Sequence, residues 1–122
     1  MYRSLLYVPA HSDRFLSKAH ERGADAIILD LEDAVPEADK DRARAGLTAS
    51  VAQVGRNGAA VFVRINAGAR AVDDARAAKA AGAAGVVVAK ADLAGLAALA
   101  PVEIPLLALI ESPAGVLDAR AC

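Results

Sequence analysis

Charged side chains stand where four of the five short apolar runs of this sequence end. The second run ends in the acidic residues Asp30, Glu32 and Asp33. The third ends in Arg64, the fourth in Lys90 and the fifth in Glu111. A charge at the end of a buried run is costly unless it is paired or binds a metal ion. Carboxylate oxygens suit a hard cation such as Mg²⁺, and a guanidinium can hold a carboxylate through two parallel hydrogen bonds. The residue types therefore indicate a combined metal and anion site.

Such a site would polarise a 2-oxo or 3-hydroxy acid and stabilise an enolate. The chemistry it favours is cleavage or formation of a carbon–carbon bond beside a carbonyl group. Arg64 and Glu111 also have a simpler interpretation, because each could form an ion pair inside the fold or lie at the surface just past a strand end.

The elements that must position these residues alternate between apolar runs and amphipathic stretches. We expect strands buried on both faces, because the runs do not alternate with polar residues, over residues 4–8, 26–31, 60–65, 85–89 and 105–110. We expect helices over residues 13–22, 38–54, 72–81 and 92–99, and from residue 113 onward. Ser12 is the expected N-cap of the first helix, and Pro113 opens the last. This strand–helix repetition predicts an α/β fold with a parallel sheet.

Three arrangements of such a sheet are considered. A dinucleotide-binding fold needs a glycine fingerprint after the first strand, and residues 8–12 contain no glycine. A flavodoxin-like phospho-receiver is an alternative, because residues 26–36 resemble its phospho-acceptor strand, although the acidic pair that it needs after the first strand is absent. The third arrangement, the front of a (β/α)8 barrel, is the one that we favour.

Composition excludes several classes of partner. Lys and Arg number 14 against 15 for Asp and Glu, a net charge of −1, which argues against a nucleic-acid partner. The single cysteine, Cys122, excludes internal disulfides and is typical of a reducing compartment. No apolar run reaches the roughly 18 residues of a membrane span, and no signal-type segment is recognisable. We therefore expect a cytoplasmic protein without a membrane partner.

Four segments carry a more specific signal. They are residues 2–19 (YRSLLYVPAHSDRFLSKA), 23–36 (GADAIILDLEDAVP), 63–66 (VRIN) and 109–115 (LIESPAG). In order and spacing they resemble the citrate lyase beta-subunit-like family, the CoA-ester lyase branch of the HpcH/HpaI aldolase superfamily. The resemblance implies that residues 1–122 are the N-terminal part of one such domain, with the first five βα units of a TIM (β/α)8 barrel that is incomplete in this chain.

The resemblance also implies an activity. The family consists of Mg²⁺-dependent carbon–carbon lyases, and the implied substrate is a (3S)-hydroxyacyl-CoA-type thioester of the citryl-, malyl- or citramalyl-CoA class. Such a thioester is cleaved by a retro-Claisen or aldol reaction, or formed by its reverse. The implied partners are an acyl-CoA or acyl-carrier thioester and further copies of the chain, in a trimer or hexamer at full length.

The resemblance assigns residues to this chemistry. Glu111 resembles the first protein ligand to Mg²⁺, and Arg64 resembles the arginine that holds the substrate's carboxylate and developing oxyanion. The acidic loop that orders the metal's waters corresponds to Asp30, Glu32 and Asp33. Asp33 favours the CoA-ester branch, because the free-acid aldolases tend to have a histidine there. The contacts to the CoA phosphates correspond to Arg14 and Lys18.

Several of these residues have a rival interpretation. Arg14 and Lys18 are four apart and could form a solvated helix face. Asp33 could simply be a turn-forming residue before Pro36. His11, in the loop after the first strand, could contact a ligand, but the simpler interpretation is a solvated loop residue. Lys90 resembles the Schiff-base lysine of other aldolases, but in a metal-dependent family we interpret it as structural or ion-paired.

Chain length supplies the main alternative function. A complete (β/α)8 barrel needs about 250 residues, and in the family the second carboxylate ligand to Mg²⁺ lies on a strand that would follow Cys122. The alternative is a truncated, non-catalytic half-barrel that binds acyl-CoA or assembles with a partner.

Overall fold

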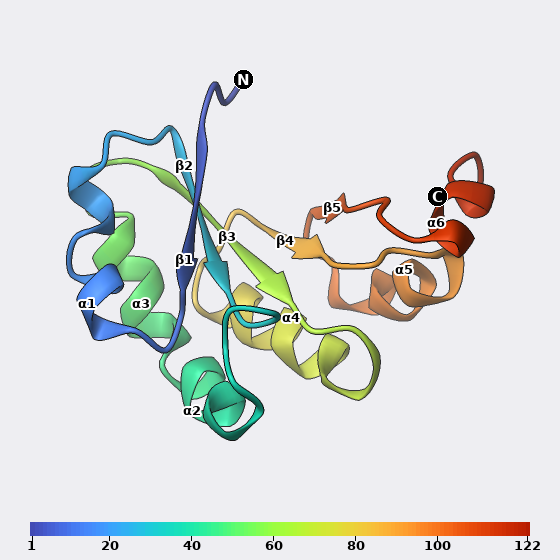
Figure 1. Ribbon diagram of the computed structural model, residues 1–122, viewed down its shortest axis with the longest axis horizontal. Helices are drawn as coiled ribbons and strands as arrows, with labels where there is room; N and C mark the ends of the chain where they lie inside the picture. Colours follow the sequence, from blue (N-terminus) through green and yellow to red (C-terminus); the bar gives the residue numbers. More distant parts are fainter.

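The computed structural model describes residues 1–122 and contains five strands, each followed by helical structure (Figure 1). The strands are β1 (Leu5–Pro9), β2 (Ala26–Asp30), β3 (Ala60–Ile65), β4 (Gly85–Val88) and β5 (Leu106–Ala108). They form one parallel sheet in the order β1-β2-β3-β4-β5. Doubly wound and flavodoxin-like sheets reverse their strand order part-way, whereas a (β/α)8 barrel keeps the order of the chain. The predicted barrel arrangement is therefore confirmed, and the phospho-receiver alternative is wrong.

The helical segments match the predicted helices closely from residue 71 onward, whereas the first two predicted helices are shorter or divided. The segments are α1 (Asp13–Leu16), η1 (Ala19–Glu21), η2 (Glu37–Asp39), α2 (Lys40–Ala45), α3 (Leu47–Val54), η3 (Gly68–Arg70), α4 (Ala71–Ala80), α5 (Leu93–Leu99), η4 (Ala100–Val102) and α6 (Pro113–Asp118). None of them has the length and apolar character that a membrane span requires.

Two of the expected helices are interrupted. The helix expected over residues 38–54 divides at Gly46, because glycine loses more backbone entropy in a helix than any other residue. The helix expected over residues 13–22 stops after Leu16, where the Ser17 hydroxyl donates a hydrogen bond to the Arg14 carbonyl and competes with the helical ladder. Ser12 occupies the predicted N-cap position of α1, but its side chain makes no capping hydrogen bond.

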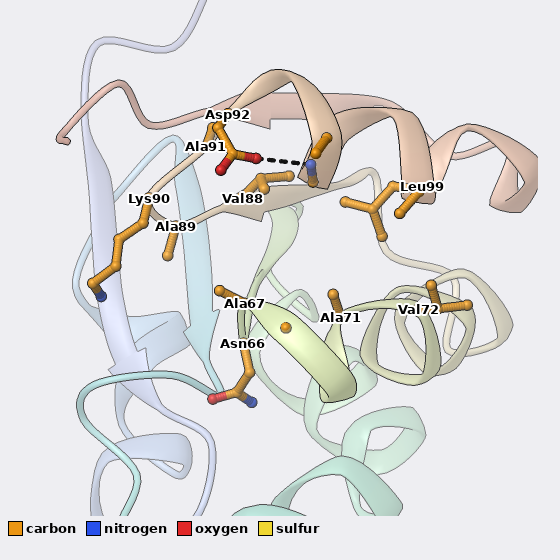
Figure 2. A pocket seen from close by; sticks show the side chains of 14 residues that line it. Asn66, Ala67, Ala71, Val72, Val88, Ala89, Lys90, Ala91, Asp92 and Leu99 are labelled. Atoms are coloured by element: carbon orange, nitrogen blue, oxygen red, sulfur yellow. Dashed lines mark hydrogen bonds between the residues drawn. The ribbon is translucent and has the colours of Figure 1, made fainter. Parts of the chain in front are cut away.

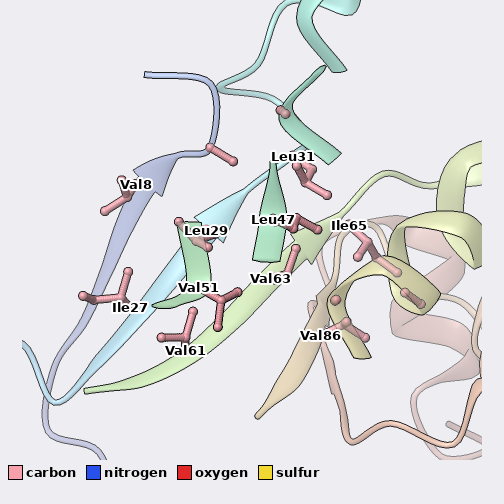
Figure 3. Packing of buried hydrophobic residues seen from close by; sticks show 14 of the residues in the cluster. Val8, Ile27, Leu29, Leu31, Leu47, Val51, Val61, Val63, Ile65 and Val86 are labelled. Atoms are coloured by element: carbon pink, nitrogen blue, oxygen red, sulfur yellow. The ribbon is translucent and has the colours of Figure 1, made fainter. Parts of the chain in front are cut away.

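The hydrophobic core lies between one face of the sheet and the helices. Apolar side chains from β1, β2, β3 and β4 pack there against residues of α2, α3 and α4, and Figure 3 shows this contact through Val8, Leu29, Leu47, Val51 and Val63. The expected burial on both faces holds for β2 and β4. The expectation is wrong for the other three strands. In β3, buried residues that face the helices alternate with half-buried ones on the opposite face. The edge strands β1 and β5, each paired on one side only, are largely exposed or half-buried.

The face opposite the helices carries an aromatic group. The parallel register places Tyr7 beside Ile28 and Ile28 beside Phe62. The Tyr2 ring covers the Phe62 ring edge-to-face, with 5.7 Å between the ring centroids. Further along the same face, towards the carboxyl ends of the strands, Asp30 of β2 lies beside Arg64 of β3. The candidate site residues therefore begin where this aromatic group ends.

Candidate active site

Asp30 and Arg64 form a buried ion pair at the carboxyl ends of β2 and β3. Arg64 Nε donates to Asp30 Oδ1 at 2.8 Å, and Arg64 Nη2 donates to Asp30 Oδ2 at 2.6 Å. The same two oxygens accept the backbone N–H groups of Glu32 and Ala34 at 2.8 and 3.1 Å. Each carboxylate oxygen of Asp30 therefore accepts two hydrogen bonds from the chain itself.

Each member of this pair stabilises the ionised form of the other. Burial alone would raise the pKa of Asp30, but the hydrogen bonds from Arg64 and from the backbone of Glu32 and Ala34 outweigh it, so the pKa is lowered. The hydrogen bonds to Asp30 raise the pKa of Arg64, whose burial only partly opposes them. The guanidinium carbon of Arg64 also lies 4.8 Å from the centroid of the Tyr7 ring, in cation–π contact. Both members of the pair are therefore ionised at neutral pH.

Glu32 lies beside this pair and is only partly satisfied. Its Oε2 accepts a hydrogen bond of 2.9 Å from Lys90 Nζ. Its Oε1 is buried and accepts no hydrogen bond, and Arg64 Nη1 lies 3.6 Å away. Asp33, the other acidic residue of the loop, is exposed, with its Oδ1 4.0 Å from Lys90 Nζ. Lys90 is thus ion-paired, as the sequence interpretation expects.

Lys90 also connects the acidic loop to Glu111. The backbone N–H of Lys90 donates to Glu111 Oε1 at 2.8 Å. The backbone of Lys90 is left-handed, with φ of 48°, a conformation that costs energy for a residue with a Cβ. With this turn, the Lys90 N–H is directed to Glu111 in the loop after β5, while the Lys90 side chain reaches Glu32 in the loop after β2. Glu32 and Glu111 are consequently bridged by one residue.

A cavity of about 390 Å³ adjoins Lys90 on the side of the helices. Its wall is formed by the loops that follow β3 and β4 and by apolar side chains of α4 and α5, as Figure 2 shows. Asp92 caps α5 at its edge by accepting the Gly95 N–H at 2.8 Å. The Lys90 side chain extends away from α5 in this view, toward the acidic loop.

The donor set around Glu32 and Glu111 can be tested against Mg²⁺. The chain gathers no group of three or more His, Cys, Asp or Glu side chains that could hold a metal ion. Mg²⁺ needs only one or two carboxylates, because water and substrate oxygens complete its shell. Glu32 offers a buried oxygen without a partner, and Glu111 uses only Oε1 within the chain. These residues fit a magnesium ion.

The basic residues expected at the CoA phosphates lie elsewhere, along β1. Arg14 and Lys18 are exposed, as a solvated helix face would be. Lys18 borders a hollow of about 340 Å³ beside β1, together with Phe15 and Arg22. The Arg14 guanidinium lies 5.7 Å from the Phe15 ring centroid. Neither residue forms a hydrogen bond or ion pair with the acidic loop, so the structure brings together the acidic residues, Arg64 and Glu111 without these two.

His11 differs from its expected surroundings. Its Nδ1 is buried and has no hydrogen-bond partner, so His11 is not the simply solvated loop residue that the sequence indicates. The side chain borders a cavity of about 240 Å³ toward α2 and α3, because the loop after β1 folds against these helices.

Two residues that support the site are missing from the sequence prediction. Lys40 Nζ donates to the carbonyls of Leu31 and Glu32, and the buried Asp74 accepts both the backbone and the side-chain N–H of Asn66. Lys40 gives no signal, because a lysine at the start of a helix resembles a solvated residue. Asp74 gives a weak one, since it shares the buried stripe of α4 with Ala75 and Ala78.

Comparison with known proteins bears on the family and the fold of the chain. Residues 3–122 match the HpcH/HpaI aldolase/citrate lyase family. The chain belongs to this family. It is 40% identical over 124 aligned positions, covering 97% of this chain and 43% of the relative, to a (3S)-malyl-CoA thioesterase of Cereibacter sphaeroides. A shorter match, 38% identical over 64 residues, covers 52% of this chain and 21% of the citrate lyase subunit beta of Leuconostoc mesenteroides subsp. cremoris.

Solved structures of the HpcH/HpaI aldolase/citrate lyase family share the fold. The CitE protein of Mycobacterium tuberculosis, in complex with magnesium and acetate, has a TM-score of 0.76 and 35% identity, and the match covers 94% of this chain and 47% of that one. The same protein with magnesium, acetoacetate and coenzyme A gives a TM-score of 0.67, 31% identity and coverage of 94% and 42%. The chain thus spans less than half the length of the relatives that it matches over most of its own length. Family and fold are both as the sequence predicts.

Proposed function

We propose that the protein, at its full natural length, is a Mg²⁺-dependent carbon–carbon lyase of the cytoplasm. Its substrate would be a (3S)-hydroxyacyl-CoA-type thioester of the malyl-, citramalyl- or citryl-CoA class. The observation that carries the proposal is the grouping of the Asp30–Arg64 pair with Glu32 and Glu111 at one edge of the sheet. The magnesium in the CitE structures and the malyl-CoA thioesterase relatives support it.

Each residue of this group would have a separate task. Glu111 would hold Mg²⁺, with the unpartnered Glu32 Oε1 as a second candidate oxygen. When bound, Mg²⁺ supplies a Lewis acid that polarises a carbonyl or hydroxyl oxygen. Arg64 Nη1 is the end of the guanidinium that Asp30 leaves free, so it would bind the substrate's carboxylate and developing oxyanion.

Asp30 and Asp33 would act differently from each other. Both oxygens of Asp30 are occupied within the chain, so Asp30 would be a positioning residue that orients the guanidinium of Arg64. Asp33 is exposed beside Lys90 and is free to order water. In the cleavage direction the hydroxyl proton leaves, the carbon–carbon bond breaks to give a 2-oxo acid or aldehyde, and the thioester enolate takes up a proton.

Hydrolysis of the same thioester is the second candidate function, because four relatives at 37–40% identity are named (3S)-malyl-CoA thioesterases. The two reactions break different bonds of one substrate. Lyase activity releases an acyl-CoA and a 2-oxo acid, whereas hydrolysis releases free CoA and a hydroxy acid. Arg14 and Lys18 would contact the CoA phosphates in both cases.

The deciding experiment offers (3S)-malyl-, citramalyl- and citryl-CoA to the full-length protein with Mg²⁺. Mass spectrometry of the products identifies the bond that breaks, and the same acids on an acyl-carrier protein test the carrier form. Acetyl-CoA with glyoxylate, pyruvate or oxaloacetate supports the lyase, and free CoA with the intact hydroxy acid supports the thioesterase. Binding of the thioester without any product would support the non-catalytic half-barrel and overturn both. Light scattering on the same sample tests the expected trimer or hexamer.

A further inference from the structure

A series of buried polar contacts connects the helices to the part of the acidic loop that follows β2, residues 31–35. Arg44 Nε donates to Asp74 Oδ1 at 2.7 Å, and Asp74 Oδ2 accepts the Asn66 backbone N–H at 2.9 Å and its side-chain N–H at 2.8 Å. Asp74 is 1% exposed and Asn66 is 8% exposed. Because both Asn66 side-chain functions are used, the amide group has a fixed orientation, with Oδ1 directed at Lys40.

Lys40 connects Asn66 to the acidic loop. Its Nζ donates to Asn66 Oδ1 at 2.6 Å, to the Leu31 carbonyl at 3.0 Å and to the Glu32 carbonyl at 2.8 Å. An ammonium group has three donors, so all three are used. Lys40 of α2 therefore holds two consecutive peptide groups of the acidic loop. Both flank Glu32, whose Oε1 has no hydrogen-bond partner.

Acceptors on β2 and β3 hold the N–H groups of the loop. The Leu31 N–H donates to the Arg64 carbonyl, and the Glu32 and Ala34 N–H groups donate to Asp30. Lys40 is the side chain that holds the carbonyls at the start of the loop. Removal of its ammonium would leave the carbonyl of Leu31 without its side-chain donor and would release Asn66 Oδ1.

We propose that Lys40 is a positioning residue, which, fixed in direction by Asn66 and Asp74, sets the peptide groups of the acidic loop so that the Glu32 carboxylate stands beside Arg64. Lys40 borders none of the cavities of the structure, so it acts through the loop and not by contact with a ligand. An effect of Lys40 on kcat rests on the proposed function, whereas its effect on amide exchange in residues 31–35 does not.

The test compares Lys40→Met with Lys79→Met in the full-length protein. Lys79 is a matched control, because its Nζ also donates to a backbone carbonyl, that of Val102, at 2.8 Å, and it does not contact the acidic loop. Hydrogen–deuterium exchange of the amides of residues 31–35 is measured by mass spectrometry. We expect at least about tenfold faster exchange in Lys40→Met and wild-type exchange in Lys79→Met. Equal exchange of these amides in the two variants would overturn the proposal.

A second readout uses the thioester that the wild type turns over. Lys40→Met should lower kcat at least about tenfold while the KM of the thioester stays within threefold, because the basic residues beside β1 are untouched. An unchanged kcat would also overturn the positioning role. If the full-length wild type turns over no thioester, the proposed function fails, and the exchange measurement still decides the role of Lys40.

Should Lys40→Met fail to fold, Asn66→Ala takes its place. This variant keeps the two bonds from Lys40 to the loop carbonyls. It removes the Asn66 Oδ1 acceptor that directs the ammonium, together with the side-chain N–H that Asn66 donates to Asp74. Faster exchange of the amides of residues 31–35 in Asn66→Ala than in the control Lys79→Met supports the proposal. Wild-type exchange in Asn66→Ala overturns it.

Discussion

Arg64 and Asp30 are direct neighbours in the parallel register of β3 and β2, and the guanidinium binds the carboxylate through two hydrogen bonds of 2.8 and 2.6 Å. The pair is buried, with 1% of the Asp30 side chain and 16% of the Arg64 side chain exposed. Arg64 is therefore both a structural residue and a candidate substrate ligand. Its Nε and Nη2 bind Asp30, and its Nη1 is the nitrogen left for a substrate.

Asp30→Asn should destabilise the protein strongly. The variant leaves the buried guanidinium without its counter-charge and places an amide where the carboxylate accepts four hydrogen bonds. Loss of one partner of a buried ion pair typically costs about 3–5 kcal/mol. Urea denaturation measures this loss as a lower free energy of unfolding. Asp25→Asn, which breaks the exposed pair with Arg3, is the control and should cost much less. Equal losses in the two variants would contradict the buried pairing.

The contribution of Asp30 to stability should disappear in acid. Its pKa is lowered in the folded protein, because the hydrogen bonds from Arg64, Glu32 and Ala34 outweigh the effect of burial. A lowered folded-state pKa gives stability above the unfolded-state value, near 4, and that stability is lost as the pH falls through the folded value. The difference in unfolding free energy between wild type and Asp30→Asn, measured by urea denaturation, should therefore be constant from pH 5 to 7 and shrink below about pH 4. A difference that grew in acid would contradict the lowered pKa.

Strands were predictable from the sequence because each depends on a local apolar run, whereas helix ends depend on further features of the backbone and side chains. The five strands match the predicted apolar runs to within two residues at each end, and only β1 extends past its run, to Pro9, because a buried strand needs an unbroken run. The long helix over residues 38–54 was not predictable in this way, since apolar periodicity continues across Gly46 while the backbone does not. Similarly, Ser12 has the right residue type for an N-cap, but capping also depends on a side-chain rotamer that the sequence does not specify.

The site was predictable only as a set of residues at one edge. Strand ends identify Asp30, Arg64 and Glu111 because carboxyl ends of parallel strands meet, but the pairing of Asp30 with Arg64 depends on the register between strands. The left-handed backbone of Lys90, which allows it to contact both Glu32 and Glu111, has no sequence signal, because Lys lacks the preference of Gly or Asn for that region.

Glu111→Gln should remove most of the proposed activity. The amide keeps the size of the side chain but is a poor ligand for a hard cation. In the full-length protein we expect kcat to fall at least about 10²-fold, the scale of losing one group that stabilises the transition state, with weaker Mg²⁺ binding by calorimetry. Glu103→Gln is the matched control, because Glu103 is exposed on the segment that precedes β5 and its side chain forms no hydrogen bond or ion pair. Full activity in Glu111→Gln would remove Glu111 from the site.

Two glycine substitutions should change stability in opposite directions. At Gly115, at the buried start of α6, an added Cβ would lie 2.5 Å from the Ala91 carbonyl oxygen. Gly115→Ala must therefore push α6 away from the loop after β4, at a cost of about 1–3 kcal/mol. At Gly46 the backbone has φ of −86°, and an added Cβ would find its nearest neighbour, the Arg42 carbonyl oxygen, at an ordinary 3.5 Å. Gly46→Ala should stabilise the protein by about 0.4–1 kcal/mol, by reducing the entropy of the unfolded chain.

Urea denaturation of Gly115→Ala tests the packing of α6 on the loop after β4, and Gly46→Ala is the comparison variant. Because Glu111 lies four residues before Gly115, displacement of α6 should also disturb the hydrogen bond from the Lys90 N–H to Glu111. Gly115→Ala should then show faster amide exchange at Lys90, whereas Gly46→Ala should leave that amide unchanged. A Gly115→Ala variant as stable as the wild type would mean that α6 does not pack on the loop after β4. The position of Glu111 would then not depend on the helix that follows it.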